Sequence, residues 1–83
     1  MRFAFTKIIK AGDRQREFNF TRMQGLDSIY NVDVNDDRGN RIIFKMIRDE
    51  QGELRITGAE RELPNWVWDT SHQLSSAIQE HQG

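Results

Sequence analysis

The chain has 83 residues, no cysteine, and twelve basic against thirteen acidic side chains, for a formal net charge of −1. A chain of this length builds one hydrophobic core, so we expect a single domain over residues 1–83. The missing cysteine excludes disulfides, thiolate metal sites and cysteine nucleophiles. The near-zero charge excludes attraction of nucleic acid or anionic lipid by the field of the whole molecule, so only a local basic patch could act.

The N-terminal stretch carries charge at Arg2 and Lys7, and no window of the sequence approaches the run of about 18 apolar residues that spans a bilayer. We therefore expect no signal peptide, no membrane span and a cytoplasmic location. Charged residues make up 30% of the chain and hydrophobic residues 36%, a balance typical of a folded domain rather than a disordered segment.

From Phe3 to Thr57, apolar residues alternate with polar ones in short runs that glycine-containing turns separate, a pattern typical of antiparallel hairpins. The first hairpin is predicted over residues 2–11 and 14–23, with Gly12-Asp13 as a type II′ turn. Its register places a set of apolar residues on the core face of the sheet: Phe3, Phe5, Ile9, Phe18 and Phe20.

Two three-residue loops that end in glycine, Asp37–Gly39 and Glu50–Gly52, predict two further hairpins. A one-residue slip would turn their apolar sets outward, so each register is well determined. The connection over residues 24–28 has no predicted conformation. The expected cross-strand pairs are Tyr30 with Met46, Val32 with Phe44, Val34 with Ile42, Met46 with Ile56, and Arg48 with Leu54.

After Gly58 the apolar spacing becomes helical. Pro64 suits the first turn of a helix, whereas Thr70–Gln73 fits a capping box that would start a helix at Ser71. We expect a short turn from Pro64 and a main helix through about Glu80. The predicted fold is α+β, an antiparallel meander of about five strands with one C-terminal helix packed on one sheet face. The helical residues expected in the core are Leu63, Trp66, Val67, Leu74, Ala77 and Ile78.

No constellation of residues predicts catalysis or metal binding. The histidines His72 and His81 fall in the predicted helix, and nothing places a serine beside either one in a way that suggests a catalytic triad. The acidic stretch Asp33–Gly39 resembles the start of a calcium loop, but Phe44 occupies the position of the bidentate glutamate. Turn chemistry accounts for its short acidic side chains. We therefore expect no enzyme activity, no metal and no cofactor.

Exposed apolar residues form the first candidate site. Ile8, Ile43 and Ile47 fall on the outer sheet face, where a cluster can mark a partner or self-association surface, although scattered exposed apolar residues are common. Trp68 is a second candidate, because a continuous helix would turn it away from the core. The high average burial of tryptophan instead favours packing in the core or over the sheet edge.

Basic residues form an alternative candidate site. Lys10, Arg41, Lys45 and Arg55 share the outer sheet face and could follow the phosphates of a single strand. Nucleic-acid-binding sheets also stack bases on aromatic side chains, whereas the phenylalanines of this chain belong to the predicted core. This separation makes nucleic acid the less favoured partner.

Two resemblances add to these interpretations. The segments Phe3–Gly12, Arg16–Phe20 and Asp36–Asn40 resemble small uncharacterised bacterial single-domain proteins of no known activity, a resemblance that implies no site. The order of strands before a helix is similar to the repeat of Pur-type single-strand-binding proteins, whose aromatic second strand corresponds to Arg16–Phe20. The chain departs from that repeat in an additional strand around residues 54–57, in acidic outer-face residues and in net charge, so no binding residue is carried over.

These observations lead to two hypotheses. The leading one is a non-catalytic interaction module that uses the isoleucine-bearing sheet face or an exposed sheet edge, with either an unknown protein partner or a second copy in a homodimer. The alternative is weak single-stranded nucleic-acid binding through the basic outer face.

Overall fold

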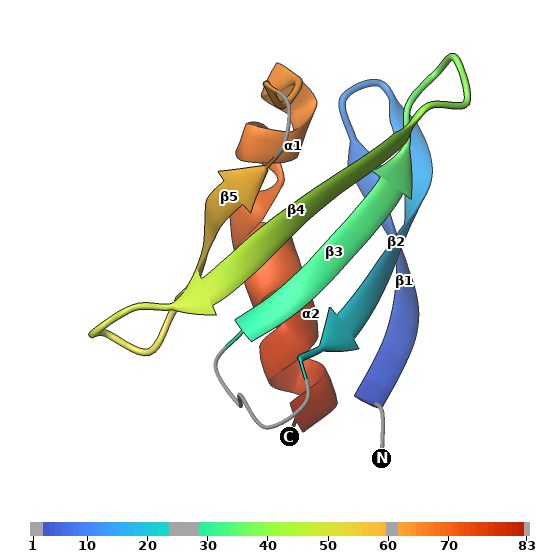
Figure 1. Ribbon diagram of the computed structural model, residues 1–83. Helices are drawn as coiled ribbons and strands as arrows, with labels where there is room; N and C mark the ends of the chain where they lie inside the picture. The colour runs from blue at the N-terminus through green and yellow to red at the C-terminus, as the bar shows by residue number, and fades with distance from the viewer. Residues whose placement is uncertain (1–2, 24–28, 60–61, 83) are drawn as a thin grey trace.

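The computed structural model describes residues 3–23, 29–59 and 62–82, and it confirms the α+β architecture (Figure 1). Five antiparallel strands form one sheet in the order β1-β2-β3-β4-β5, and the C-terminal helices lie on one face of it. The predicted connection over residues 24–28 and the side chain of Phe3 lie outside the described part. The elements are β1 (Phe3–Ala11), β2 (Arg14–Arg22), β3 (Ile29–Asn35), β4 (Arg41–Arg48), β5 (Leu54–Ala59), α1 (Asn65–Asp69) and α2 (Ser71–Gln82).

The three predicted hairpin registers are confirmed. Ala11 pairs with Arg14 across the Gly12-Asp13 turn, Val34 pairs with Ile42, and Arg48 pairs with Leu54. Gly12 has a φ of 72°, as the first central residue of a type II′ turn requires. These registers bring the alternating apolar residues onto one face, because successive side chains of a strand point to opposite faces.

In both three-residue loops, the aspartate that precedes the loop accepts two backbone N–H groups. In the β3–β4 loop, Asp36 Oδ1 accepts the backbone N–H groups of Arg38 and Asn40 at 2.9 and 2.8 Å. In the β4–β5 loop, Asp49 Oδ1 accepts those of Gln51 and Glu53, both at 2.9 Å. Short acidic side chains thus replace missing backbone partners in the turns, which is the turn chemistry expected from the sequence.

The β4–β5 pairing contains a bulge that alternation alone does not predict. Met46 pairs with Ile56 and Lys45 with Gly58, so Thr57 is an extra residue on β5. Because Gly58 has no side chain, the outer face beside Lys45 has a shallow hollow of about 260 Å³. Its lining residues are Asn31, Ile43, Phe44, Lys45, Gly58 and Ala59.

Both predicted helix starts occur, in separate segments. Pro64 is extended, with ψ of 153°, and its carbonyl accepts Val67 N–H at 3.0 Å, so it precedes α1 rather than lying in the first turn as predicted. The second helix begins at Ser71, the other predicted start. The hydroxyl of Thr70, the residue just before it, donates to Trp66 O at 2.6 Å. That bond ties Thr70 back to α1, and α2 then crosses behind the sheet (Figure 1).

The core lies between the sheet and α2. Phe18, Phe20 and Phe44 of the sheet and Leu74 and Ile78 of α2 are at most 1% exposed. Phe5, Ile9 and Trp66 are half-buried at its margin, which places the two β1 residues at a rim of the core rather than at its centre. The remaining buried apolar residues are Ala11, Tyr30, Val32, Val34, Met46, Leu54, Leu63, Val67 and Ala77.

Gly52 provides a test of the hairpin geometry. Its φ is +84° and no atom lies within 4 Å of an added Cβ, so Gly52→Ala imposes backbone strain without a steric clash. We expect a loss of about 1–2 kcal/mol in the free energy of unfolding, measured by urea titration. Gly58→Ala is the control, because that strand glycine lacks a positive φ and also has open space around it. Equal stabilities of the two variants would contradict this geometry.

The pKa of Asp49 lies below its ordinary value, because the Arg55 guanidinium hydrogen-bonds to the carboxylate and the backbone N–H groups of Glu53 and Gln51 add to this. A lowered folded-state pKa means that the ionised carboxylate stabilises the fold above the unfolded-state pKa of about 3.9, and that this contribution disappears as pH falls through the folded value.

Asp49→Asn keeps an acceptor oxygen for the turn and removes the charge. We therefore expect this variant to lose less unfolding free energy than the parent as the pH is lowered below about 4, measured by urea titration between pH 2 and 6. Glu50→Gln, an exposed change in the same loop, is the control and should follow the parent. An Asp49→Asn profile parallel to that of the parent would contradict the assignment.

Candidate functional site

The three outer-face isoleucines do not form one patch. Ile8 is 64% exposed on β1 and Ile43 is 51% exposed on β4, while Ile47 is half-buried further along β4. Strands β2 and β3 lie between the two sides, so about 14 Å separates Ile8 from β4 at the usual strand spacing. The expected common face is present, but the apolar surface is divided into Ile8 on one side and Ile43 with Ile47 on the other.

Trp68 lies on the solvent side of α1. Trp68 is 51% exposed, so it is not packed into the core or over the sheet edge, as its residue type favours. The physical reason is helix geometry, because Trp66 and Val67 of the same short helix take the positions that face the protein. Trp68 is also on a different element from all three isoleucines, and α1 lies on the helix-covered side of the sheet (Figure 1).

The basic candidates are dispersed and partly neutralised. Arg41 Nη2 lies 3.1 Å from Asp33 Oδ2, and Arg55 pairs with Asp49 and, at 3.9 Å, with Glu53. Lys10 is on β1, whereas Lys45 is on β4 with two strands between them. The outer face therefore carries alternating charges rather than a continuous basic track.

A polar ladder crosses the middle of the outer face. Thr6 Oγ1 donates to Asn19 Oδ1 at 2.7 Å, and Asn19 Nδ2 donates to Asp33 Oδ1 at 2.9 Å. Arg41 completes the ladder through its ion pair with Asp33, so four strands contribute to one network. This network fills the space between the two groups of isoleucines with satisfied polar groups.

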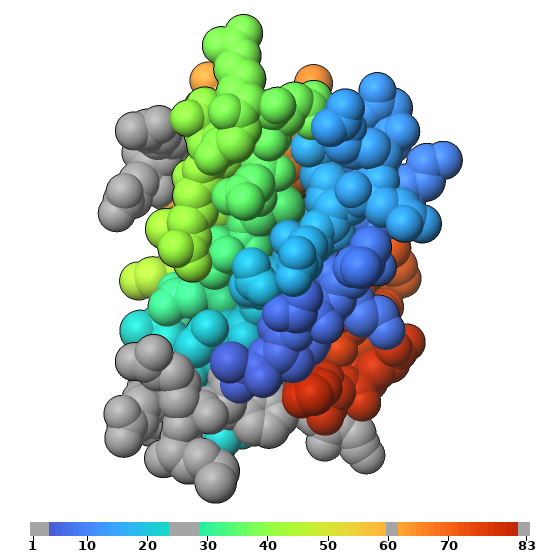
Figure 2. Space-filling view, turned by 90° about the vertical axis from the view of Figure 1, so that its right-hand side faces the viewer, coloured from blue at the N-terminus to red at the C-terminus, as the bar shows by residue number. Residues whose placement is uncertain are grey.

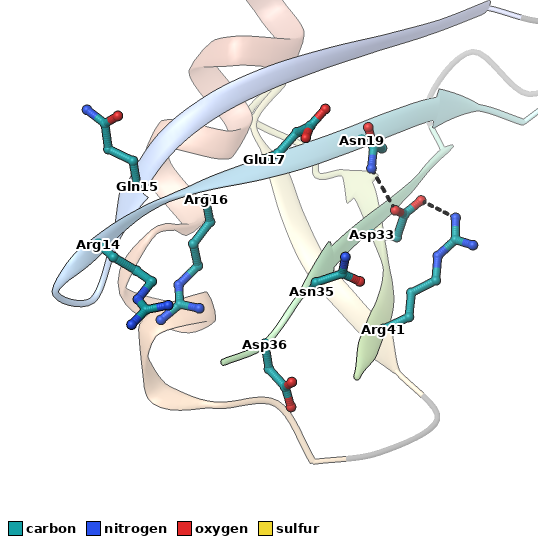
Figure 3. A pocket seen from close by; sticks show the side chains of 9 residues that line it. All are labelled: Arg14, Gln15, Arg16, Glu17, Asn19, Asp33, Asn35, Asp36 and Arg41. Atoms are coloured by element: carbon teal, nitrogen blue, oxygen red, sulfur yellow. Dashed lines mark hydrogen bonds and ion pairs between the residues drawn. The ribbon is translucent and has the colours of Figure 1, made fainter. Parts of the chain in front are cut away.

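The sheet divides at one end. Pairing of β2 with β3 begins at Asn19 and Asp33. Beyond these residues the hairpin end of β2 pairs with β1 and the end of β3 pairs with β4, so the two strand pairs separate. Figure 3 shows the resulting cleft, which has a volume of about 340 Å³ and an entirely polar lining. The residues that line it are Arg14, Gln15, Arg16, Glu17, Asn19, Asp33, Asn35, Asp36 and Arg41.

Arg16 spans this division as a buried cation. Only 7% of the residue is exposed, its Nε donates to Ala11 O at 2.9 Å, and its Nη1 donates to Asp37 Oδ1 at 2.8 Å. Its guanidinium carbon also lies 3.8 Å from the centroid of the Trp66 ring, a cation–π contact. One side chain thereby links the first hairpin, the β3–β4 loop and α1.

Sequence reasoning did not single out Arg16. Alternation places Arg16 on the core face opposite Ile9. A charged residue at such an inward position could have indicated a buried ion pair. Only the fold shows its partners, because Asp37 and Trp66 are 21 and 50 positions away in the sequence. Since Arg14 Nε also lies 3.5 Å from the same Asp37 oxygen, the charges beside the cleft are engaged with one another.

The two outer edges of the sheet are treated differently. At the β5 edge, the backbone N–H of Leu54 donates to Ser75 Oγ of α2 at 3.2 Å. Gln79 of the same helix donates at 3.5 Å to Gly52 O, in the loop before β5, a carbonyl that also accepts Arg48 Nη1 at 2.8 Å. The Ser75 side chain of α2 therefore occupies the Leu54 N–H, a backbone group that a further strand would need, which is one way of protecting a sheet edge.

The β1 edge has no such cover among the described residues. In a type II′ hairpin the residues that flank the turn exchange hydrogen bonds, so the odd-numbered residues of β1 bond to β2. The backbone groups of the even-numbered residues point the other way, and within residues 3–23, 29–59 and 62–82 no hydrogen bond reaches them. These residues are Ala4, Thr6, Ile8 and Lys10, and all four are exposed.

The end of α2 lies beside this open edge, as Figure 2 shows from that side. Lys7 Nζ lies 3.8 Å from Glu80 Oε2, and the Phe5 ring stacks on His81 with centroids 4.0 Å apart. Lys7 faces the helix-covered side of the sheet between the half-buried Phe5 and Ile9. An inward-facing charge on an edge strand limits indiscriminate strand pairing, so this edge is open but selective.

Asp37→Asn tests the role of the Arg16 contacts. The change removes the charge that balances a buried guanidinium, so we expect the unfolding free energy to fall by about 1–3 kcal/mol in urea titrations. Asp13→Asn, at an exposed position of the Gly12-Asp13 turn, is the matched control and should change stability by less than about 0.5 kcal/mol. A neutral Asp37→Asn variant would show that the buried cation does not depend on this carboxylate.

Comparison with known proteins finds no family model, no curated protein and no solved structure that matches the chain. Among the described residues, no helix is both long and apolar enough to cross a bilayer. In the same residues, no three histidine or acidic side chains gather as a metal site would require. The open β1 edge and the polar cleft are therefore the features from which a function can be argued.

Proposed function

We propose that this protein is a non-catalytic interaction module that binds an extended polypeptide segment by strand addition at β1. The observation that carries the proposal is the contrast between the two sheet edges. At the β5 edge the Ser75 hydroxyl of α2 accepts the Leu54 N–H and Gln79 bonds the loop just before the strand, whereas four exposed residues of β1 present outward backbone groups with no such contact among the described residues. Strand addition obtains its affinity from such main-chain groups and its specificity from alternate side chains.

The side chains of β1 support the same proposal. On the outer face, an added strand would cover Ile8, the most exposed large apolar residue described in this chain. On the helix side, it would complete the cover of Phe5 and Ile9, which are half-buried at the rim of the core. Both faces of the edge therefore gain apolar contact on binding, in addition to backbone hydrogen bonds.

The polar cleft gives weaker support for a function. Arg41 pairs with Asp33, and Arg14 and Arg16 share Asp37, so its cations already have counter-charges. Among the described residues that line the cleft there is no hydroxyl nucleophile and no histidine. The cleft is better explained by the division of the sheet and by the Arg16 contacts than by catalysis.

A selection from a library of nine-residue peptides on the immobilised protein tests strand addition. Ile8→Pro removes an N–H that points away from β2, and proline is tolerated on an edge strand, so the fold should survive while binding is lost. Ile8→Thr is the matched control, because it keeps the N–H and high strand propensity and should retain at least part of the binding.

Amide hydrogen exchange checks the proline variant, since the inward amides of Lys7 and Ile9 should stay protected if β1 remains paired with β2. Peptides that bind the parent protein and Ile8→Thr but not Ile8→Pro would support the proposal. Peptides that bind Ile8→Pro equally well would overturn it. It would also be overturned if the library yields no binding peptide while a parallel titration shows binding of a single-stranded oligonucleotide.

A further inference from the structure

We infer that the strand added at β1 is β1 of a second copy of this chain, which gives a two-fold symmetric dimer with a continuous ten-stranded sheet. This inference rests on the proposed use of the β1 edge and specifies the occupant. Two identical antiparallel strands can pair around a two-fold axis, so each contact occurs twice. The residues of β1 must then be complementary to the same residues in reverse order.

The outward backbone groups select one register. An axis through Lys7 pairs Thr6 with Ile8 of the second copy and Ala4 with its Lys10. This register pairs all four outward residues within β1. An axis through Thr6 or Ile8 instead would leave one of the four without a partner in β1 and use three. On the outer face the register centred on Lys7 places no like charges opposite each other, and it brings the two Ile8 side chains into diagonal contact.

The helix-covered face matches in the same register. Phe5 lies opposite Ile9 of the second copy, so residues half-buried at the rim of each core meet across the seam. The two Lys7 side chains face each other at the centre, which alone would be unfavourable. Each Lys7 lies 3.8 Å from its own Glu80, so the seam carries two positive and two negative charges. Glu80 is therefore what makes the central lysine pair compatible with association.

The second sheet edge explains why pairing ends at two copies. Addition at β1 consumes that edge in both copies, and the outer edges of the joined sheet are then the two β5 strands. At β5, Leu54 N–H already donates to Ser75 Oγ, and the bulge at Thr57 interrupts the regular strand. A third copy pairing with β5 would have to displace the Leu54–Ser75 bond and follow a bulged strand, which favours closure as a dimer over growth as a filament.

Charge reversal at the seam tests this arrangement. Lys7→Glu leaves four negative charges at the centre and Glu80→Lys leaves four positive ones, so each should weaken self-association by about tenfold or more. The double variant Lys7→Glu/Glu80→Lys restores neutrality and should restore the dimer. Both side chains are more than half exposed in the monomer, at 52% and 70%, so monomer stability should change little.

Analytical ultracentrifugation of the full chain from micromolar to millimolar concentration is the measurement. A parent dimer, a monomeric Ile8→Pro variant and rescue by the double charge reversal would establish the inference. A parent that stays monomeric to millimolar concentration overturns it, and the peptide selection then decides separately whether the edge binds another segment. A dimer that survives Ile8→Pro overturns the self-pairing at β1, again leaving the peptide selection to decide whether the edge binds another segment, and failed rescue overturns the register centred on Lys7.

Discussion

The buried guanidinium of Arg16 is the interaction on which the organisation of this small domain depends. A buried charge is costly unless its hydrogen bonds and counter-charge are supplied, and here Ala11, Asp37 and Trp66 supply them from three separate elements. The sheet divides beside Arg16, where β2 and β3 no longer pair. At this division the side chain joins the first hairpin to the β3–β4 loop through Asp37 and to α1 through Trp66.

The position of the helices then determines how the two sheet edges differ. Because α1 packs near the first hairpin through Trp66, α2 runs across the sheet and brings Ser75 and Gln79 to the start of β5. The last turn of α2 approaches β1, where Glu80 meets Lys7 and His81 stacks on Phe5. The same helix thus bonds the start of β5 at Leu54 and approaches β1 through a charge pair and a ring stack, which leave the outward backbone groups of β1 open.

This asymmetry is the physical basis for the proposed interaction at β1. Unpaired edges promote association, and proteins usually restrict them with lysines, bulges or covering elements. Here β5 has a bulge and helix contacts, whereas β1 is a regular nine-residue strand whose main restriction is Lys7. The β1 edge is regular and exposed, and its inward-facing charge, Lys7, is balanced by Glu80. It can therefore pair with another strand, but that strand must accommodate the charge of Lys7.

Alternation and turn chemistry were sufficient to predict the hairpins, their registers and the core residues, because these depend on neighbours close in sequence: Gly12, Gly39 and Gly52 set the turns, and a slip would expose Phe18 or Phe44. The same information placed Ile8 and Ile43 on one face but not on opposite sides of a polar ladder, since strand order is a long-range property. It could not find the partners of Arg16, the exposure of Trp68 or the difference between the β1 and β5 edges. Those features were decided only by the tertiary structure, because each depends on where α1 and α2 lie against a sheet that precedes them in the chain.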